Sequence, residues 1–71
     1  MGAAVDAPDA SGYTVLITAA VNDKRRMAQL MLFLGADPHV RTRDGMTALA
    51  WAKELGHPEI EAMLLEGGAR Q

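Results

Sequence analysis

The sequence contains no cysteine, one serine, two histidines and three aromatic residues. The absence of cysteine excludes disulfides and thiolate metal sites. His39 and His57 lie far apart in the sequence without a nearby convergent carboxylate, so they do not form a metal-binding pattern. Ser11 has no adjacent base that could make it a nucleophile. We therefore expect a protein that is not an enzyme and that needs neither a metal nor another cofactor.

The chain also lacks a long apolar run and a strong charge of either sign. No apolar stretch approaches the roughly 18 residues of a membrane span, and the N-terminus lacks the basic start of a secretion signal. Seven basic and nine acidic side chains give a net charge of −2, which provides no general attraction to nucleic acid or to anionic membranes. These absences predict an intracellular, soluble protein, cytoplasmic by default with the nucleus left open, that binds neither nucleic acid nor membrane.

The length of the chain limits how much apolar surface it can bury. Its 71 residues, of which 49% are hydrophobic, correspond to one small globular domain spanning residues 1–71. A domain of this size buries only about 60% of the surface that its unfolded chain exposes. Without disulfides or a metal, the natural source of extra stability is association with another chain or a larger parent protein.

The chain repeats itself with a constant offset. The segment that begins at Gly12 aligns without a gap on the segment that begins at Gly45. Seven identical pairs share this offset: Gly12 and Gly45, Thr14 and Thr47, Leu16 and Leu49, Ala19 and Ala52, Leu32 and Leu65, Gly35 and Gly68, Ala36 and Ala69. A fixed period of this kind, within the range of about 20–50 residues, indicates a stack of similar structural units.

Each unit is predicted to contain two helices. The first helices, at about 14–21 and 47–54, begin at Thr14 and Thr47, whose hydroxyls are suited to cap a helix N-terminus. Turns at 22–23 and 55–56 follow, where Asn22 and Gly56 tolerate a left-handed backbone. The second helices are expected at about 24–34 and 58–66.

The second helices carry clear boundary and core signals. Pro58 suits the first helical position, and Gly35 and Gly68 are placed to end the two helices. Apolar residues recur at i, i+3 and i+4 in both, which predicts one buried face on each helix. These residues are Met27, Leu30 and Met31 in the first unit, and Ile60, Met63 and Leu64 in the second.

The segments "DASGYTVLITAA" and "TRDGMTALAWAKELGHPEIEAMLLEGGA" resemble the ankyrin repeat. The unit of that family has about 33 residues and consists of a β-turn and two antiparallel helices. The resemblance implies an all-α ankyrin-repeat solenoid with two helix-turn-helix units and hairpin-like loops. Repeat 1 would span about 9–41 and repeat 2 about 42–71. Residues 5–8, "VDAP", look like the tail of a partial preceding repeat.

Two departures from the family pattern affect stability. The Pro of the family signature is Val15 and Ala48 here, and its His is Ile17 and Ala50. Because that His joins a hydrogen-bond network in the family, the fold should depend more on apolar packing. His57 matches the Gly-His position of the family, where we expect it to cap a helix.

The resemblance also implies a non-catalytic protein–protein interaction module. Ankyrin arrays bind protein partners through turn tips and first-helix faces. On this sequence those positions are Ala10, Ser11, Tyr13, Val21, Asn22, Arg43, Asp44, Met46, Glu54 and Leu55. Tyr13 is expected to be an exposed contact residue, whose replacement by Ala weakens binding and leaves the melting temperature nearly unchanged. Trp51 is assigned to the core.

Self-assembly is the alternative function. Val21, Phe33, Leu34 and Leu55 are apolar at positions where the family often has polar residues. They suggest a covered patch and a possible homodimer through it. The chain could equally be a fragment of a larger ankyrin array, whose other repeats would supply the missing cover.

Overall fold

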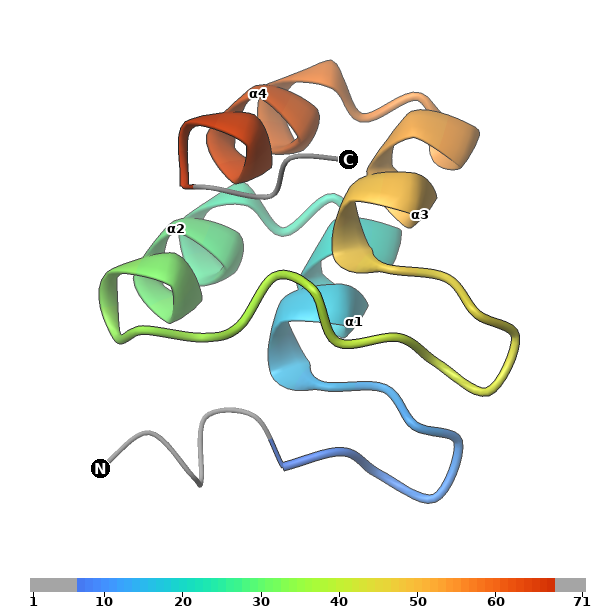
Figure 1. Cartoon of the computed structure of the whole chain (residues 1–71). Coiled ribbons are helices and arrows are strands. Elements are labelled where there is room, and N and C mark those ends of the chain that lie inside the picture. The colour runs from blue at the N-terminus through green and yellow to red at the C-terminus, as the bar shows by residue number, and fades with distance from the viewer. Residues whose placement is uncertain (1–6, 68–71) are drawn as a thin grey trace.

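The computed structural model describes residues 7–67, which contain four helices and no strand. The helices are α1 (Val15–Val21), α2 (Arg25–Phe33), α3 (Ala48–Leu55) and α4 (Pro58–Glu66). They form two antiparallel pairs, stacked so that α3 lies beside α1 and α4 beside α2 (Figure 1). The predicted all-α fold of helix-turn-helix units is confirmed. The repeat limits at residues 9–41 and 42–71 remain a prediction, because the second extends outside the described range.

Capping hydrogen bonds to threonine side chains explain where the first helix of each pair begins. The Thr14 hydroxyl accepts a hydrogen bond from the Ile17 amide at 3.2 Å, and the Thr47 hydroxyl accepts one from the Ala50 amide at 3.1 Å. Each cap contributes about 1 kcal/mol by satisfying an amide that has no partner within the helix. Pro58 occupies the first position of α4, as predicted. The predicted helix boundaries are therefore correct to within one residue.

The turn between the helices of each pair needs one left-handed residue. Gly56 has a φ of 74° after α3, and the His57 amide then donates to the Ala52 carbonyl. In the first pair the left-handed residue is Asp23, with a φ of 57°, whereas Asn22 has a φ of −97°. The expectation for Asn22 was wrong by one position, because Asp23, and not Asn22, is the equivalent of Gly56 in the repeat.

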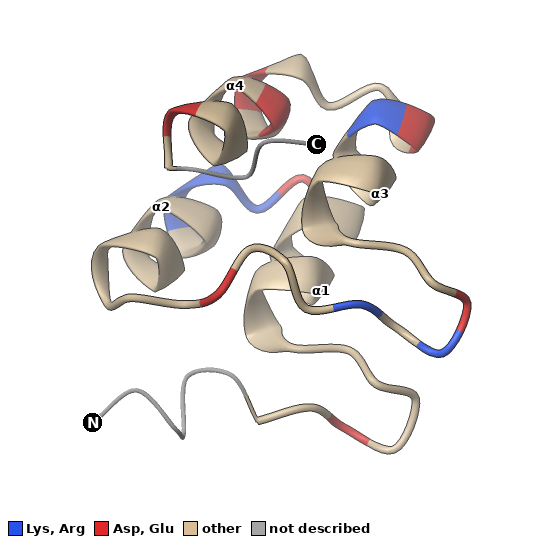
Figure 2. Cartoon of the chain, in the orientation of Figure 1, with Lys and Arg blue, Asp and Glu red and all other residues tan. Residues whose placement is uncertain are grey.

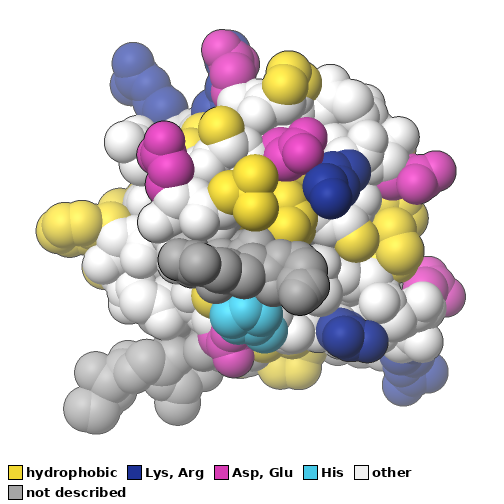
Figure 3. Space-filling model, turned by 45° about the horizontal axis from the view of Figure 1, so that its top comes forward, with side chains coloured by type: hydrophobic (Ala, Val, Ile, Leu, Met, Phe, Trp, Pro, Cys, Tyr) yellow, Lys and Arg dark blue, Asp and Glu magenta, His cyan; other side chains and the backbone are white. Residues whose placement is uncertain are grey.

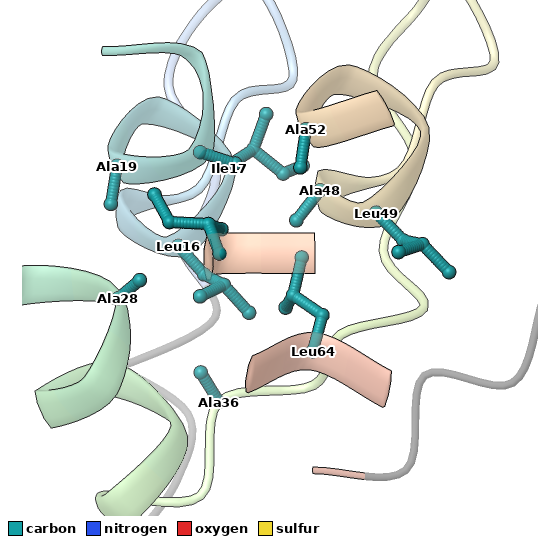
Figure 4. Packing of buried hydrophobic residues seen from close by; sticks show 11 residues of the cluster. Leu16, Ile17, Ala19, Ala28, Ala36, Ala48, Leu49, Ala52 and Leu64 are labelled. Carbon is teal, nitrogen blue, oxygen red and sulfur yellow. The ribbon is translucent and has the colours of Figure 1, made fainter. Parts of the chain in front are cut away.

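The core lies between the two helix pairs and combines large and small side chains. Leu16, Ile17, Ile60 and Leu64 are each no more than 1% exposed. Figure 4 shows Leu16, Ala36 and Leu64 directed into the space between the helices. The buried small residues are Ala19, Ala20, Ala28, Ala36, Ala48 and Ala52. Full burial of each Leu or Ile stabilises the fold by roughly 1.5–3 kcal/mol, and the alanines allow the helices to approach closely enough for this burial.

The apolar stripe of α2 is less buried than its sequence predicts. Met31 packs against the core, but Met27 and Leu30 are 42% and 47% exposed. The assignment of these two residues to the core was wrong. Met27 is the equivalent of Ile60, which is buried between the two helix pairs, so Met27 should face away from the second pair. The periodicity of the stripe does not show whether a neighbouring helix pair covers it. In the equivalent stripe of α4, Ile60 and Leu64 are fully buried, as expected.

Candidate protein-binding surface

Two hairpin-like turns project beyond the starts of α1 and α3 (Figure 1). In the first, the Asp9 amide donates to the Tyr13 carbonyl at 2.8 Å, and the Asp9 carboxylate accepts hydrogen bonds from the Ser11 and Tyr13 amides. In the second, the Thr42 amide donates to the Met46 carbonyl at 2.9 Å. These bonds hold the exposed turn tips in fixed positions. We call the four exposed residues at the two turn tips the tip residues; they are Ala10, Ser11, Arg43 and Asp44.

The two turns touch each other at Gly12. This glycine has a φ of 83°, and a Cβ added to it would lie 3.2 Å from the Arg43 backbone nitrogen. That distance is shorter than a comfortable van der Waals contact, so the close approach of the turns requires a glycine here. Gly45, at the equivalent position, has a φ of 80° and open space around it.

Comparison of these two glycines gives a stability prediction. Gly45→Ala should cost about 1–2 kcal/mol, because an L residue is strained at positive φ. Gly12→Ala should cost at least about 1 kcal/mol more, because its methyl group would also force the turns apart. Urea unfolding followed by circular dichroism measures both losses. Equal losses would show that the turns separate without cost.

An aromatic pair joins the first turn to the second helix pair. The ring centroids of Tyr13 and Trp51 are 6.3 Å apart with an interplanar angle of 31°. Both side chains are half-buried and pack against the core. The assignment of Trp51 to the core is therefore correct only in part, and the expectation of an exposed Tyr13 was wrong. This contact links two residues that do not occupy equivalent positions, so the repeat period alone does not pair them.

The remaining predicted residues lie at the other ends of α1 and α3. Asn22 is exposed and its side-chain amide donates to the Thr18 carbonyl, whereas Val21 is half-buried. Glu54 and Leu55 are exposed at the end of α3. Helices of seven and eight residues separate this group from the turns by roughly 10 Å. The structure therefore places the predicted residues in two groups, with Met46 half-buried beside the turns.

Trp51 and Thr18 occupy the space between these groups. Trp51 shares a helix face with Glu54 and Leu55 at i+3 and i+4, and Thr18 stands at the equivalent position on α1. Sequence analysis missed both as surface residues. The signal that could have identified them is their equivalence in the two repeats, together with their helical spacing from predicted contact residues. With them, the candidate surface runs from the tip residues across Tyr13 and Trp51 to Leu55.

Charges of both signs are mixed over the molecule. Figure 2 shows Lys or Arg next to Asp or Glu in the second turn and at the end of α3. Figure 3 shows exposed hydrophobic side chains among charges of both signs on one face. Arg25 at the start of α2 pairs with Glu59 of α4, and both side chains are more than half exposed. Such an exposed pair contributes at most about 1 kcal/mol. Three consecutive exposed basic residues, Lys24, Arg25 and Arg26, lie at the start of α2, whereas basic and acidic residues are neighbours in the second turn and at the end of α3.

His57 connects the two helix pairs and does not cap α4 with its side chain. It occupies the N-cap position, but its Nε2 lies 3.3 Å from the Val21 carbonyl oxygen. Because a carbonyl only accepts, Nε2 carries the proton in this hydrogen bond. Nδ1 lies 3.8 Å from the Asp23 carboxylate. The expected capping role was therefore wrong, since the ring turns toward α1.

Residues 7–67 contain neither a cluster of metal-ligating side chains nor a helix that could span a membrane. His39 is exposed and lies next to Asp37, whose carboxylate accepts from the His39 amide at 2.9 Å. Within this range, no three His, Cys, Asp or Glu side chains gather as a metal site would need. The four helices described here are all too short or too polar to cross a lipid bilayer.

The apolar patch expected for a homodimer is not formed by its four residues together. Because α1 and α2 run antiparallel, Val21 lies beside the start of α2, while Phe33 and Leu34 lie at its other end (Figure 1). Leu55 ends α3, at the same end of the molecule as Val21. Phe33 is 85% exposed and Leu34 is 49% exposed.

Comparison with known proteins agrees with this architecture. The family model described as "Ankyrin repeats (3 copies)" matches residues 1–71. An ankyrin repeat-containing protein of Treponema pallidum (strain Nichols) is 39% identical over 69 residues, covering 96% of this chain and 23% of the relative. The ankyrin repeat protein YahD of Escherichia coli (strain K12) is 40% identical over 63 residues, covering 82% of this chain and 31% of the relative.

A third relative is a human protein. The ankyrin repeat and MYND domain-containing protein 1 of Homo sapiens is 39% identical over 56 residues, which are 79% of this chain and 6% of that protein. The chain thus spans less than a third of the length of each of these three relatives. Since the family model matches the full chain and the helix pairs have the expected arrangement, this chain belongs to the ankyrin repeat family.

Proposed function

We propose that the chain is a non-catalytic module that binds a protein partner through the tip residues and the adjoining faces of α1 and α3. Ankyrin repeats are a protein–protein interaction module and are generally not enzymes. The turn hydrogen bonds support this role because a surface that is already ordered loses little conformational entropy on binding. Mixed charges over the same surface favour a protein partner over nucleic acid.

The observation that carries the proposal is the Tyr13–Trp51 pair. It spans both helix pairs and lies between the tip residues and the ends of α1 and α3. Tyr and Trp are enriched at the centres of protein interfaces, where a half-buried ring offers contact area at low entropy cost. The tip residues, which are polar apart from Ala10, and Glu54 on the other side would then form the rim of the interface.

Substitution of the tip residues tests the proposal without disturbing the fold. The double variant Ser11→Arg, Arg43→Glu changes two side chains at the turn tips, so its melting temperature should stay close to that of the wild type. Binding should weaken at least about tenfold, because the added charge at position 11 and the reversed charge at position 43 no longer match the charges of the partner's surface. The immobilised chain captures proteins from a lysate, and the affinity of a purified captured protein is then measured by calorimetry.

The matched control is Gln29→Arg, which adds a charge at an exposed position on α2, away from the turns. It should leave the affinity unchanged. Tyr13→Ala should reduce both affinity and stability, the latter by about 1 kcal/mol, since Tyr13 packs on Trp51. A partner that binds the tip variant as tightly as the wild type would place the interface elsewhere.

A further inference from the structure

Helix α2 carries a row of exposed side chains along one side, which we call the α2 face. It consists of Arg26, Gln29, Leu30 and Phe33, whose spacing of i, i+3, i+4 and i+7 places them on one side of the helix. Leu30 is 47% exposed and Phe33 is 85% exposed. The four residues line a hollow in the surface. Because α2 and α4 lie on the side of the molecule opposite the two turns, this face is separate from the tip residues (Figure 1).

The second repeat shows that stacking of helix pairs does not account for the α2 face. The equivalent residues on α4 are Glu59, Ala62, Met63 and Glu66. Although α4 packs against the first helix pair, all of them except the half-buried Met63 are exposed. A helix pair in front of the first one would therefore cover Leu30 in part and leave the rest of the α2 face open.

The chemistry of this face is particular to the first repeat. On α4 the two ends of the row are Glu59 and Glu66, whereas on α2 they are Arg26 and Phe33. An aromatic ring that is 85% exposed contributes little to the core, because it remains in contact with water. Aromatic residues and Arg are the side chains that contribute most often to binding energy at protein interfaces.

The positive charge at the start of α2 is not balanced within the described chain (Figure 2). Arg25 pairs with Glu59, but Lys24 and Arg26 form no ion pair among residues 7–67. No acidic residue lies in the first turn of α2, so the helix dipole adds to this positive charge. A carboxylate from another molecule would therefore be attracted to Lys24 and Arg26.

The basic region and the apolar part of the α2 face are continuous. A second hollow, lined by residues 23–27, meets the hollow of the α2 face at Arg26. Its lining contains three consecutive basic residues at 24–26 and one acidic residue, Asp23. The surface along α2 thus changes from basic at the start of the helix to apolar at Leu30 and Phe33.

We propose that this surface binds an amphipathic helix of another protein, with acidic residues over the start of α2 and apolar residues two turns away on Leu30 and Phe33. Arg26 and Phe33 are seven residues apart, which is about 10 Å along α2 and equals two turns of the partner's helix. A helix fits better than an extended segment, because its backbone is already hydrogen-bonded and residues 7–67 contain no strand with which a segment could pair. The proposal concerns a different face from the proposed function and does not depend on it.

A second copy of the chain does not provide such a helix. Its α4 has carboxylates seven residues apart, at Glu59 and Glu66. Laid along the α2 face in either direction, α4 would bring one carboxylate to Arg26 and bury the other against Phe33, which is unfavourable for a charge. A second α2 would bring further cations to the same surface and leave the positive charge unbalanced.

The test uses a synthetic helix as the probe and the whole chain as its receptor. The probe is a capped, alanine-rich peptide of about 18 residues, long enough to form a helix in water. It carries two Glu in one turn and two Leu two turns further along the same side. In an NMR titration of the isotope-labelled chain, amide shifts should change at residues 24–34 and stay constant at the tip residues. Shifts confined to the turns, or no shifts at millimolar peptide, would overturn the proposal.

Two substitutions test the two parts of the contact separately. Arg26→Glu reverses a charge and Phe33→Ala removes the exposed ring, and both should leave the melting temperature nearly unchanged. Each should weaken binding of the probe at least about tenfold. The matched controls, Arg41→Glu and Leu65→Ala, change an exposed cation and an exposed apolar residue outside the α2 face and should bind like the wild type. Wild-type affinity in Arg26→Glu or Phe33→Ala would contradict the proposal.

Changes in the probe show which kind of partner the surface selects. A peptide with Lys in place of both Glu, and one with Ala in place of both Leu, should each bind at least about tenfold more weakly. An oligothymidylate should not bind, because the aromatic ring of the α2 face lies two turns away from the cations and does not interleave with them. Binding of the oligothymidylate that exceeds that of the peptide and is lost in Arg26→Glu would assign the surface to nucleic acid and overturn the proposal.

The chain alone provides the last measurement. Its amide shifts at residues 24–34 should not depend on its own concentration, since a second copy offers no matching helix. Shifts there that grow with concentration and disappear in Phe33→Ala would assign the α2 face to a second copy and overturn the proposal. None of these measurements involves the tip residues, so their outcome is independent of the proposed binding function.

Discussion

Replacing Ile60 with Ala should leave a large fraction of the chain unfolded at room temperature. Ile60 is fully buried between the two helix pairs. Removing most of its side chain typically costs about 2–5 kcal/mol, from lost transfer free energy and the cavity left behind. A single core in a chain of this size rarely supplies more than about 3–5 kcal/mol. Urea unfolding monitored by the helical circular dichroism signal would show the loss as a midpoint close to zero denaturant.

Met27→Ala is the matched control, because Met27 occupies the position in the first repeat that is equivalent to Ile60. Its side chain is already 42% exposed, so we expect a loss below about 1 kcal/mol. The comparison isolates the effect of the neighbouring helix pair from that of the residue type. Similar losses for both variants would mean that Met27 is as well covered in solution as Ile60.

Ala28→Glu should be as damaging as Ile60→Ala, for a different reason. Ala28 is fully buried at the contact between the helix pairs. A carboxylate there has no room, and burying it without a partner costs at least about 3 kcal/mol. Ala and Glu both form helices well, so the loss does not come from helix propensity. Thermal unfolding of the variant should show a transition that is strongly lowered or absent.

The reverse exchange at the equivalent position provides the control. Glu61 lies in the first turn of α4 and is half-buried on the outer side of the second pair. Glu61→Ala removes a favourable charge near a helix N-terminus, which is worth only about 0.3–1 kcal/mol. Its melting temperature should therefore fall by only about 1–8 °C. A large loss would show that Glu61 has a structural role in the core.

Local features of the fold could be predicted from the sequence because local residues determine them. Thr14, Thr47 and Pro58 fix helix starts through groups within the same turn, so the boundaries were predicted to within one residue. The constant repeat period predicted the stacking of similar pairs. The left-handed residue at Asp23 was missed because Asn22 was chosen by its residue type and not by its equivalence with Gly56.

Burial and contacts between the pairs could be predicted less well. The stripe of Met27 and Leu30 has the same spacing as that of Ile60 and Met63, but only position in the stack decides which is covered. The Tyr13–Trp51 contact and the hydrogen bond of His57 to the Val21 carbonyl join segments of different repeats. Neither follows from the pattern within one unit. The sequence therefore predicted the tip residues of the candidate surface, but not the Tyr13–Trp51 contact at its centre.

Because the hydrogen bonds that close the two turns do not use the tip side chains, binding specificity can change while the backbone of the turns stays the same. The closing hydrogen bonds come from backbone groups and from the side chains of Asp9 and Thr42, which flank the tips. The exposed side chains of Ala10, Ser11, Arg43 and Asp44 are thus separable from the framework that supports them. New recognition properties can accumulate at these positions through single substitutions, each tolerated by the same backbone, which makes the turns a natural starting point for a randomised library.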